Sequence, residues 1–250
     1  MFDLLKARAA HGYQAIPDPL IANIHPSFPG LPQILRAHAE DFAQAALFCP
    51  VQAIQPYSLD LGKCVFCGAC QRAFPQTFVF KPDFRMASST REGLLIKWDA
   101  ATQKSCLPIV QVSNLLRKLF KHSFALRNVS AGGCNACELE LGASSNVNFD
   151  MGRYGIEVVA SPRHADGLIL TGPVSANMAD ALQTTWEAIP QPKVLILAGA
   201  CAISGGLFAD SKAVDRAWLS TIDAVLYIPG CPAHPLSIIH ALMSLLGRVK

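Results

Sequence analysis

The sequence predicts an α/β protein in which a small α+β domain precedes a larger domain with a mostly parallel sheet. Three observations predict this. Turn-forming residues crowd the first third of the 250-residue chain, short apolar runs alternate with helix-length segments in the second half, and the nine cysteines fall mainly into two groups. Alternation of strands and helices is typical of parallel sheets, because parallel strands need crossover connections. The length suffices for two modest domains.

The composition excludes several classes of protein. Apolar residues make up 51% and charged residues 16% of the chain, so it can bury a core and is not disordered. The formal net charge is +3 without a dense run of Lys or Arg, which predicts no nucleic-acid partner. Prolines interrupt the apolar stretch from 224 to 247, so no clean run of about 20 residues is left for a membrane span.

The cysteine usage indicates metal binding in a reducing compartment. The first residues lack the basic-then-apolar order of a signal peptide, and they lack twin arginines. Disulfides would need an oxidising compartment, and an odd number of cysteines with tight spacing is more typical of metal ligands. We therefore expect a chain that is soluble or attached peripherally to a membrane.

Four segments follow one another along the chain. Residues 1–35 are rich in proline and predict an extended N-terminal arm, and residues 36–98 form the small first domain. Residues 99–122 form a linker, and residues 123–250 form the α/β domain. In that domain we expect strands at 124–129, 156–160, 167–171, 194–198 and 224–228, and helices at 175–188, 214–220 and 236–246.

The linker contains a predicted basic amphipathic helix. Its apolar face is formed by Leu115, Leu116, Leu119 and Phe120, with Arg117, Lys118 and Lys121 beside it. Such a helix docks on its own domain, or it contacts a membrane-embedded partner or lipid headgroups. The sequence leaves both interpretations open.

The first cysteine group has the spacing of an iron–sulfur site. Cys64, Cys67 and Cys70 form a Cys-x-x-Cys-x-x-Cys motif, which wraps one corner of a 4Fe-4S cube. In two-cluster ferredoxins the fourth ligand is a Cys-Pro of the other motif, and Cys49-Pro50 has that form. The ligands that a second such cluster would need are all absent. We predict one 4Fe-4S cluster; a zinc site is the alternative, although zinc sites more often use paired Cys-x-x-Cys motifs.

The second cysteine group follows the carboxyl ends of predicted strands. Cys134 and Cys137 follow the strand that ends near Val129, and Cys201 and Cys231 follow two later strands. Ligands of open α/β sheets bind at this edge, so four thiolates from three loops can converge there. Neighbouring glycines would let the backbone approach the inorganic sulfides closely and donate N–H hydrogen bonds.

The first group lies in a stretch similar to known ferredoxin domains. Residues 59–70 resemble bacterial-type ferredoxins, and more closely the ferredoxin-like subunits of complex I and of membrane hydrogenases. This resemblance implies that residues 36–98 are a ferredoxin-like domain that has lost one of two clusters.

The second half closely resembles the small subunit of NiFe hydrogenases and the homologous 20 kDa subunit of complex I. The matching stretches are Gly-Gly-Cys-Asn-Ala-Cys-Glu at 132–138, Ser-Pro-Arg-His-Ala-Asp at 161–166, Gly-Ala-Cys-Ala-Ile-Ser-Gly-Gly at 199–206 and Tyr-Ile-Pro-Gly-Cys-Pro at 227–232. The resemblance implies a flavodoxin-like fold. It also implies that Cys134, Cys137, Cys201 and Cys231 bind the proximal 4Fe-4S cluster.

Two details favour one branch of this family. Complex I subunits have adjacent cysteines at the first site, whereas this chain has Cys134-x-x-Cys137, which favours the hydrogenase branch. The missing twin-arginine leader disfavours exported uptake hydrogenases. The resemblance is then to the membrane-bound group 4 hydrogenases, including formate hydrogenlyase, with the ferredoxin and small subunit fused.

The resemblance implies an electron-transfer subunit of an oxidoreductase complex. Electrons would pass between a ferredoxin-type cluster and the proximal cluster, and the catalytic NiFe site would lie on another subunit. Expected partners are the hydrogenase large subunit or its complex I homologue, the membrane subunits, and another ferredoxin-type subunit or soluble carrier. The chain would be cytoplasmic, on the cytoplasmic face of the inner membrane. The alternatives are a complex-I-like quinone-reducing assembly and a zinc-stabilised scaffold.

Several other side chains have weaker signals. Arg163 and His164 either tune the proximal cluster or belong to a loop in which Arg163 pairs with Asp166 or with the partner subunit. Glu138 is either interfacial or an acidic residue at a helix N-terminus. We expect Cys106 to be a plain thiol outside both groups, and His234 and His240 to be structural; no Ser-His-Asp set or Walker loop is present.

Overall fold

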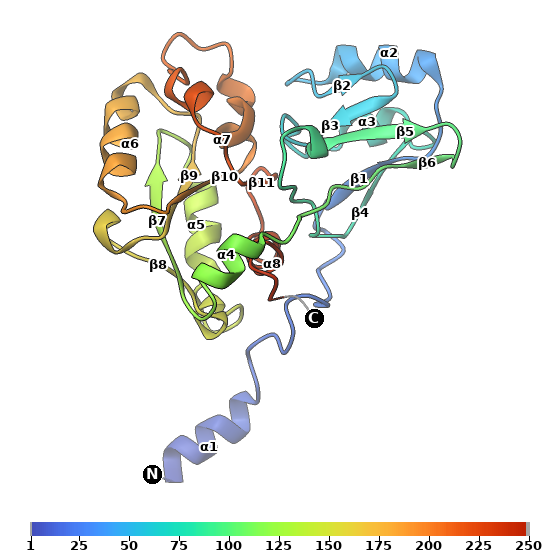
Figure 1. The fold of residues 1–250 in the computed structure, drawn as a ribbon. Helices are drawn as coiled ribbons and strands as arrows, with labels where there is room; N and C mark the ends of the chain where they lie inside the picture. The colour runs from blue at the N-terminus through green and yellow to red at the C-terminus, as the bar shows by residue number, and fades with distance from the viewer. Residues whose placement is uncertain (1, 249–250) are drawn as a thin grey trace.

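The computed structural model describes residues 2–248, which form two packed lobes and a projecting N-terminal helix (Figure 1). The carboxyl-terminal lobe is built on a five-stranded sheet, and the amino-terminal lobe contains a four-stranded and a two-stranded sheet. The predicted fold class, an α/β chain with a mostly parallel, flavodoxin-like sheet preceded by a small α+β part, is confirmed.

The five-stranded sheet is parallel throughout, with the order β11-β10-β9-β7-β8. Its strands are β7 (Phe124–Ser130), β8 (Ile156–Val158), β9 (Gly167–Thr171), β10 (Val194–Ala198) and β11 (Leu226–Ile228). Every residue of β9 and β10 is buried. Central parallel strands carry helices on both faces, and for this reason these two segments are apolar without alternation.

Helices cover both faces of this sheet. On one face, α6 (Ala176–Ala188) places Leu182 in a core with Leu168 and Leu170 of β9. On the other face, α5 (Ala136–Ala143) and α8 (Pro235–Leu245) share a core with Ile169 and Ile196. Alternate residues of β9 therefore belong to different cores, as period-two geometry requires.

The amino-terminal lobe is antiparallel. The four-stranded sheet has the order β2-β3-β5-β6, from Ile54–Gln55, Ser58–Asp60, Leu95–Asp99 and Lys104–Ser105. β1 (Leu31–Ile34) pairs with β4 (Phe78–Lys81), and the helices are α2 (Ala39–Phe48) and α3 (Ala69–Ala73).

Three predicted elements need correction. The arm over residues 1–35 is not wholly extended, because α1 (Phe2–His11) is a helix without buried residues and β1 joins a sheet. The linker contributes β6. Residues 214–220 do not form an α-helix; they include only the start of a 3-10 turn, η5 (Trp218–Thr221).

The linker helix α4 (Asn114–Leu119) begins at Ser113, whose hydroxyl accepts a hydrogen bond from the amide of Leu116. Leu116 and Phe120 are buried, whereas Leu115 is 64% and Leu119 is 47% exposed. The four apolar residues therefore do not share one buried face. One pair docks the helix on its own lobe and the other pair faces outward.

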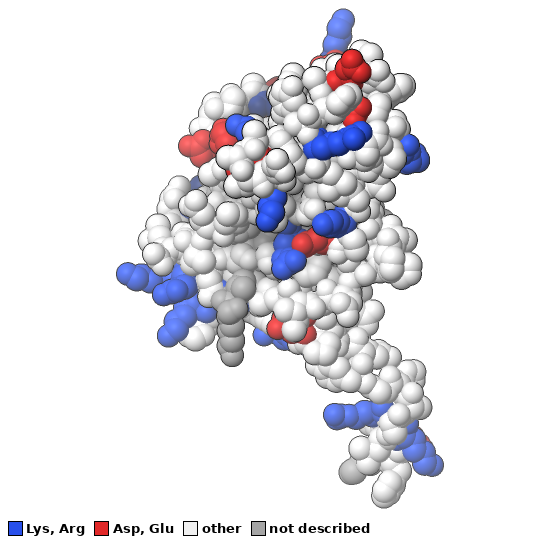
Figure 2. Space-filling model, turned by 90° about the vertical axis from the view of Figure 1, so that its right-hand side faces the viewer, with Lys and Arg blue, Asp and Glu red and all other residues white. Residues whose placement is uncertain are grey.

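The two lobes share one core and a short backbone pairing. Ser88 and Tyr227 exchange two backbone hydrogen bonds of 3.0 and 2.9 Å. A single apolar cluster contains both Leu61 of the amino-terminal lobe and Ile203 of the carboxyl-terminal lobe. The face in Figure 2 carries charged side chains only in small separate groups. Across residues 2–248, no helix is both long and apolar enough to cross a membrane.

Candidate functional site: two cysteine groups

The amino-terminal cysteine group consists of Cys49, Cys64, Cys67 and Cys70. Cys49 ends α2, the next two lie in the loop after β3, and Cys70 lies in α3. All four line one cavity, together with apolar side chains such as Ile54 and Leu59. The loop turns tightly at Phe66 and Gly68, whose φ angles are 55° and 69°. The structure therefore brings this predicted ligand set together.

Backbone amides and burial determine the electrostatics of this group. The amide of Ala53 donates to Cys49 Sγ at 3.2 Å, and that of Phe66 donates to Cys64 Sγ at 3.3 Å. Burial, with repulsion from the other thiolates, raises the pKa of Cys64 and raises that of Cys70 to about 11. Four thiolates here need a compensating cationic centre.

The carboxyl-edge cysteine group consists of Cys134, Cys137, Cys201 and Cys231. Cys134 follows β7, Cys137 lies in α5, Cys201 lies in α7 (Ala200–Ser204), and Cys231 follows β11. These segments leave the same edge of the parallel sheet. Cys201 and Cys231 repel a thiolate at Cys137, and Cys134 repels a thiolate at both Cys201 and Cys231.

Burial again opposes thiolate charge at this edge. It raises the pKa of Cys137 to about 12 and that of Cys201 to about 11, and it raises the pKa of Cys231. Repulsion among the thiolates adds to the effect, while Arg216 opposes it at Cys201. The backbone of Ala233 acts in the opposite direction and lowers the pKa of Cys137.

Two glycines make room for these sulfurs. A Cβ on Gly199 would stand 2.6 Å from Cys137 Sγ, and a Cβ on Gly206 would stand 3.0 Å from Cys201 Sγ. Both glycines have positive φ angles, of 89° and 56°. Such a cradle beside two of the four thiols fits a sulfur-rich metal group.

Glu138 lies beside this group. Thr171 Oγ1, at the carboxyl end of β9, donates to Glu138 Oε1 at 2.7 Å. The carboxylate acts electrostatically on both Cys137 and Cys201. Glu138 therefore combines an N-terminal position on α5 with proximity to the cysteines.

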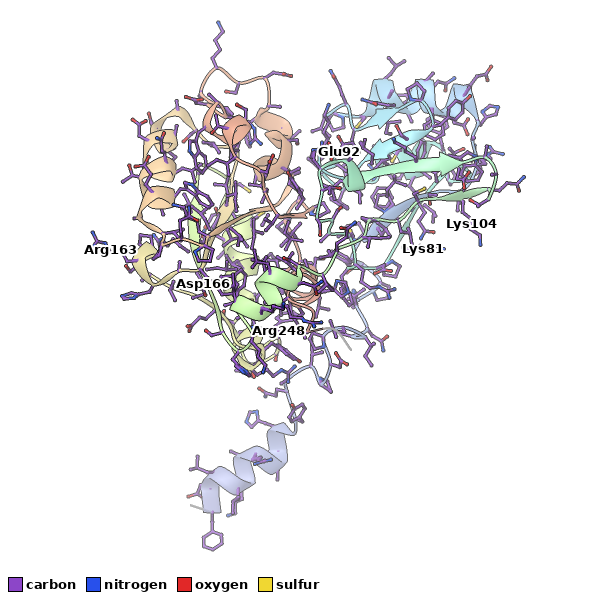
Figure 3. All side chains as sticks on the ribbon, in the orientation of Figure 1. Lys81, Glu92, Lys104, Arg163, Asp166 and Arg248 are labelled. Atoms are coloured by element: carbon purple, nitrogen blue, oxygen red, sulfur yellow. The ribbon has the colours of Figure 1, made fainter. Side chains whose placement is uncertain are left out.

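Arg163 and His164 lie away from the carboxyl-edge cysteine group, at the opposite end of the sheet. They are exposed in the 3-10 turn η3 (Pro162–His164), which precedes the amino end of β9, whereas the cysteines follow the carboxyl ends of strands. Arg163 is labelled in Figure 3. This placement argues against the expected role beside the cysteines. Within residues 2–248 the expected ion pair between Arg163 and Asp166 is also not formed, and Asp166 accepts from the Ala125 amide at 2.7 Å.

The remaining predictions concern single side chains. Cys106 is exposed and outside both groups. His234 accepts from the amide of Leu236 at the start of α8, and His240 packs edge-on against Phe84, so both have structural contacts. Sequence reasoning missed Arg216, whose guanidinium donates to backbone carbonyls around Cys201. No motif marks it, because its partners are backbone atoms.

No single-ion site is formed by the side chains of residues 2–248: no three His, Cys, Asp or Glu side chains come close enough to share one metal ion. The thiols of the amino-terminal group instead surround a shared space. Four thiols per group, without histidine, are the donors that iron–sulfur groups use.

Comparison with known proteins identifies relatives that match about half of this chain. Formate hydrogenlyase subunit 7 of Escherichia coli (strain K12) is 40% identical over 138 residues, covering 55% of this chain and 54% of that protein. The probable membrane-bound hydrogenase subunit mbhJ of Pyrococcus furiosus is 34% identical over 122 residues, covering 49% of this chain and 73% of that protein. NADH-quinone oxidoreductase subunit 6 of Thermus thermophilus is 40% identical over 119 residues, covering 47% of this chain and 65% of that protein.

The chain thus spans about half the length of formate hydrogenlyase subunit 7. The family described as NADH ubiquinone oxidoreductase, 20 Kd subunit, matches residues 134–245, which begin at Cys134 and include all four carboxyl-edge cysteines. On these matches the chain belongs to the NADH ubiquinone oxidoreductase 20 kDa subunit family.

Proposed function

We propose that this chain is an iron–sulfur electron-transfer subunit of an oxidoreductase complex, with one 4Fe-4S cluster held by each cysteine group. The observation that carries the proposal is the pair of four-cysteine groups, one within residues 49–70 and the other from three loops between residues 134 and 231. Membership of the 20 kDa subunit family supports it, because the matched relatives are named as subunits of hydrogenases and quinone oxidoreductases.

The amino-terminal cysteine group is assigned to a ferredoxin-type cluster. The spacing of Cys64, Cys67 and Cys70, with Cys49 contributed by the end of α2, supports a ferredoxin-like domain fused to the family domain. The carboxyl-edge group is assigned to the proximal cluster. The glycine cradle around Cys137 and Cys201 supports this assignment.

The packing of the lobes supports an electron relay between the two groups. A Cβ on Gly62 would stand 2.8 Å from Ile203 Cγ2. Gly62 precedes Cys64 by two residues, and Ile203 follows Cys201 by two. The two ligand loops therefore adjoin at one apolar contact, and electron transfer between them would be favoured because its rate falls steeply with distance.

Each cluster would supply one-electron transfer. The chain would determine the distance between the two clusters, the charge around them and the exclusion of water from them. The amides of Ala53 and Phe66 donate to cysteine sulfurs and would thereby stabilise the added negative charge of a reduced group at the amino-terminal site. Apolar neighbours such as Leu59 exclude water from the amino-terminal site.

The assembly is proposed to be a membrane-associated NiFe hydrogenase, of the hydrogen-evolving or formate hydrogenlyase type. The catalytic large subunit would cover the carboxyl edge, where Leu139, Leu207 and Phe208 are exposed. A ferredoxin-type subunit or soluble carrier would meet the amino-terminal lobe, and membrane subunits would hold the complex on the cytoplasmic face. The second candidate is a complex-I-like quinone oxidoreductase, favoured by the 40% identity to the Thermus subunit.

Metal analysis of the anaerobically purified complex tests this function. We expect about eight iron and eight sulfide per chain, as two cubanes require. Nickel in a co-purifying subunit favours the hydrogenase, and its absence favours the complex-I-like assembly. Zinc in place of iron would contradict both.

Two matched cysteine variants sharpen the test. Cys67 and Cys106 are both exposed, but only Cys67 belongs to a group. Cys67→Ala should lower the iron content from about eight to about four per chain, since one cubane loses a ligand. Cys106→Ala should leave it unchanged. Equal iron in both variants would remove the ferredoxin-type cluster from the proposal.

A further inference from the structure

Arg216 lies in the loop between α7 and η5, and its guanidinium is turned inward. It donates four hydrogen bonds, all to backbone carbonyls: to Pro173 at 3.2 Å, to Cys201 at 3.0 Å, to Ala202 at 2.7 Å and to Ile203 at 3.1 Å. Three of these acceptors are consecutive and belong to the short helix that carries Cys201.

The guanidinium of Arg216 binds carbonyl groups that the short helix α7 leaves without partners. A five-residue helix leaves most of its carbonyls without intrahelical partners, and its carboxyl end carries partial negative charge. The planar fork of an arginine can satisfy several such acceptors at once, which a lysine ammonium cannot do in the same way. The fourth bond, to Pro173, ties α7 to the loop after β9, and Gly172 of this loop packs against Gly133 next to Cys134.

Within the described part of the chain, Arg216 forms no salt bridge with an acidic side chain. Among residues 2–248 the salt bridges involve other cations, and the hydrogen bonds of the Arg216 guanidinium go to carbonyl oxygens. Its cation favours the thiolate of Cys201, where it opposes the repulsion from neighbouring thiolates. An uncompensated cation half-buried beside a ligand cysteine acts in a low-dielectric region and is screened little by salt.

We propose that Arg216 is a positioning residue of the carboxyl-edge site, which fixes the Cys201 loop and, through its charge, raises the reduction potential of the group bound there. This inference rests on the proposed function. The added electron makes the bound group more negative, so a nearby fixed cation stabilises the reduced state relative to the oxidised one. No bond forms or breaks in this one-electron step, and in the test dithionite supplies the electron.

The test is a redox titration of the purified complex, followed by electron paramagnetic resonance, with three variants. Arg216→Gln removes the charge and should lower the equilibrium constant for reduction of the carboxyl-edge cluster about tenfold, or about 59 mV for one electron. Arg216→Lys keeps the charge, so its equilibrium constant for reduction should stay within about twofold of that of the unmodified complex. This variant should release iron to a chelator faster, because the planar fork of the guanidinium is lost.

Two internal controls accompany these variants. Lys212→Gln removes an equal charge from an exposed position in the same loop, and it should leave the potential unchanged because solvent screens it. The amino-terminal cluster should keep its potential in every variant. An unchanged potential in Arg216→Gln, or an equal drop in Lys212→Gln, overturns the proposal.

The remaining outcomes are also decisive. If Arg216→Gln does not retain the cluster, Arg216→Lys decides the question. An equilibrium constant for reduction within about twofold of that of the unmodified complex supports the charge effect, and a tenfold lower constant overturns it. Failure of the proposed function is recognised separately, because the unmodified complex would then contain only one cluster signal, or none, before any variant is compared.

Discussion

At the scale of single residues, the carboxyl-edge site depends on a glycine, because a side chain at that position would collide with a ligand sulfur. Gly199 has a φ of 89° and stands where a Cβ would come within 2.6 Å of Cys137 Sγ. Both the backbone conformation and the space therefore require glycine. A methyl group would displace one sulfur of the four.

Gly199→Ala should disrupt the carboxyl-edge group. The strained conformation costs on the order of 1 kcal/mol or more, and the contact with Cys137 Sγ pushes this thiol away from the others. We expect iron to fall from about eight to about four per chain. Iron analysis with electron paramagnetic resonance of the remaining cluster measures this.

Gly142→Ala is the matched control. Gly142 lies in α5, in the same lobe, and a Cβ there would meet nothing within 4 Å. This substitution should keep all the iron and stabilise the helix by about 0.5–1 kcal/mol. Full iron in Gly199→Ala as well would show that the cradle is not required.

At the scale of elements, α8 links a loop of the site to the core. Pro235 occupies its first turn, where the missing N–H is harmless, and His234 Nδ1 accepts from the Leu236 amide at 3.1 Å. The ring of His234 also packs against Phe28 and Phe149. Burial lowers the pKa of His234 from 6.5.

The start of α8 should therefore be sensitive to acid. The unfolded segment takes up a proton as the pH falls below about 6.5, whereas the folded state binds it only at lower pH. The stabilisation is thus complete above 6.5 and is lost as the pH falls toward the lowered pKa of His234. We expect protection of α8 amides from hydrogen exchange, corrected for intrinsic rates, to fall by up to about tenfold per pH unit between pH 6.5 and 5.5.

His234→Asn should reduce this acid sensitivity. Asparagine keeps a side-chain acceptor at the N-cap and removes the titrating ring. His11→Asn, on the exposed helix α1, should leave the pH dependence of α8 unchanged. The same acid-induced loss in His234→Asn would assign the effect to another group, such as the half-buried ring of His240, whose pKa burial also lowers.

At the scale of the whole molecule, one apolar contact joins the two lobes near both cysteine groups. Ile203 is 6% exposed and meets Gly62 across the lobe boundary. On the amino-terminal side, Asp60 accepts from the Gly62 amide and pairs with Arg91 at 2.6 Å. The loop that leads to Cys64 is therefore held from both sides.

Ile203→Ala should loosen this boundary. Deleting the buried side chain costs about 2–5 kcal/mol and leaves a cavity at the contact. We expect faster hydrogen exchange in residues 60–64 on the opposite lobe, and slower electron exchange between the two clusters because their separation is less fixed. Hydrogen exchange with mass spectrometry and freeze-quench spectroscopy measure these two quantities.

Leu182→Ala is the comparison at this scale. Leu182 is fully buried in α6 and belongs to the same apolar cluster, but it lies away from Gly62. It should lower stability by a similar amount without changing exchange in residues 60–64. Identical exchange in the two variants would mean that the lobes are coupled elsewhere, for example at Ser88 and Tyr227.

The sequence by itself determined much of the carboxyl-terminal lobe. Strands β9 and β10 have the bounds that their apolar runs predicted, and α6 and α8 differ from prediction by one residue at one or both ends. These segments are long and apolar, and their burial depends on period and hydrophobicity, which are local properties. The amino-terminal cysteine set was chosen from its spacing, and the carboxyl-edge set from strand order together with the resemblance to the hydrogenase small subunit.

Only the tertiary structure decided the contacts that carry no local signal. Arg216 binds backbone carbonyls, which every residue possesses, so no motif could reveal it. Leu115 and Leu116 are adjacent and alike, and only packing decides which one is buried. Arg163 and His164 follow a recognisable motif but lie at the amino end of β9. Spacing thus selects which residues can act together, and the folded chain decides which of them meet.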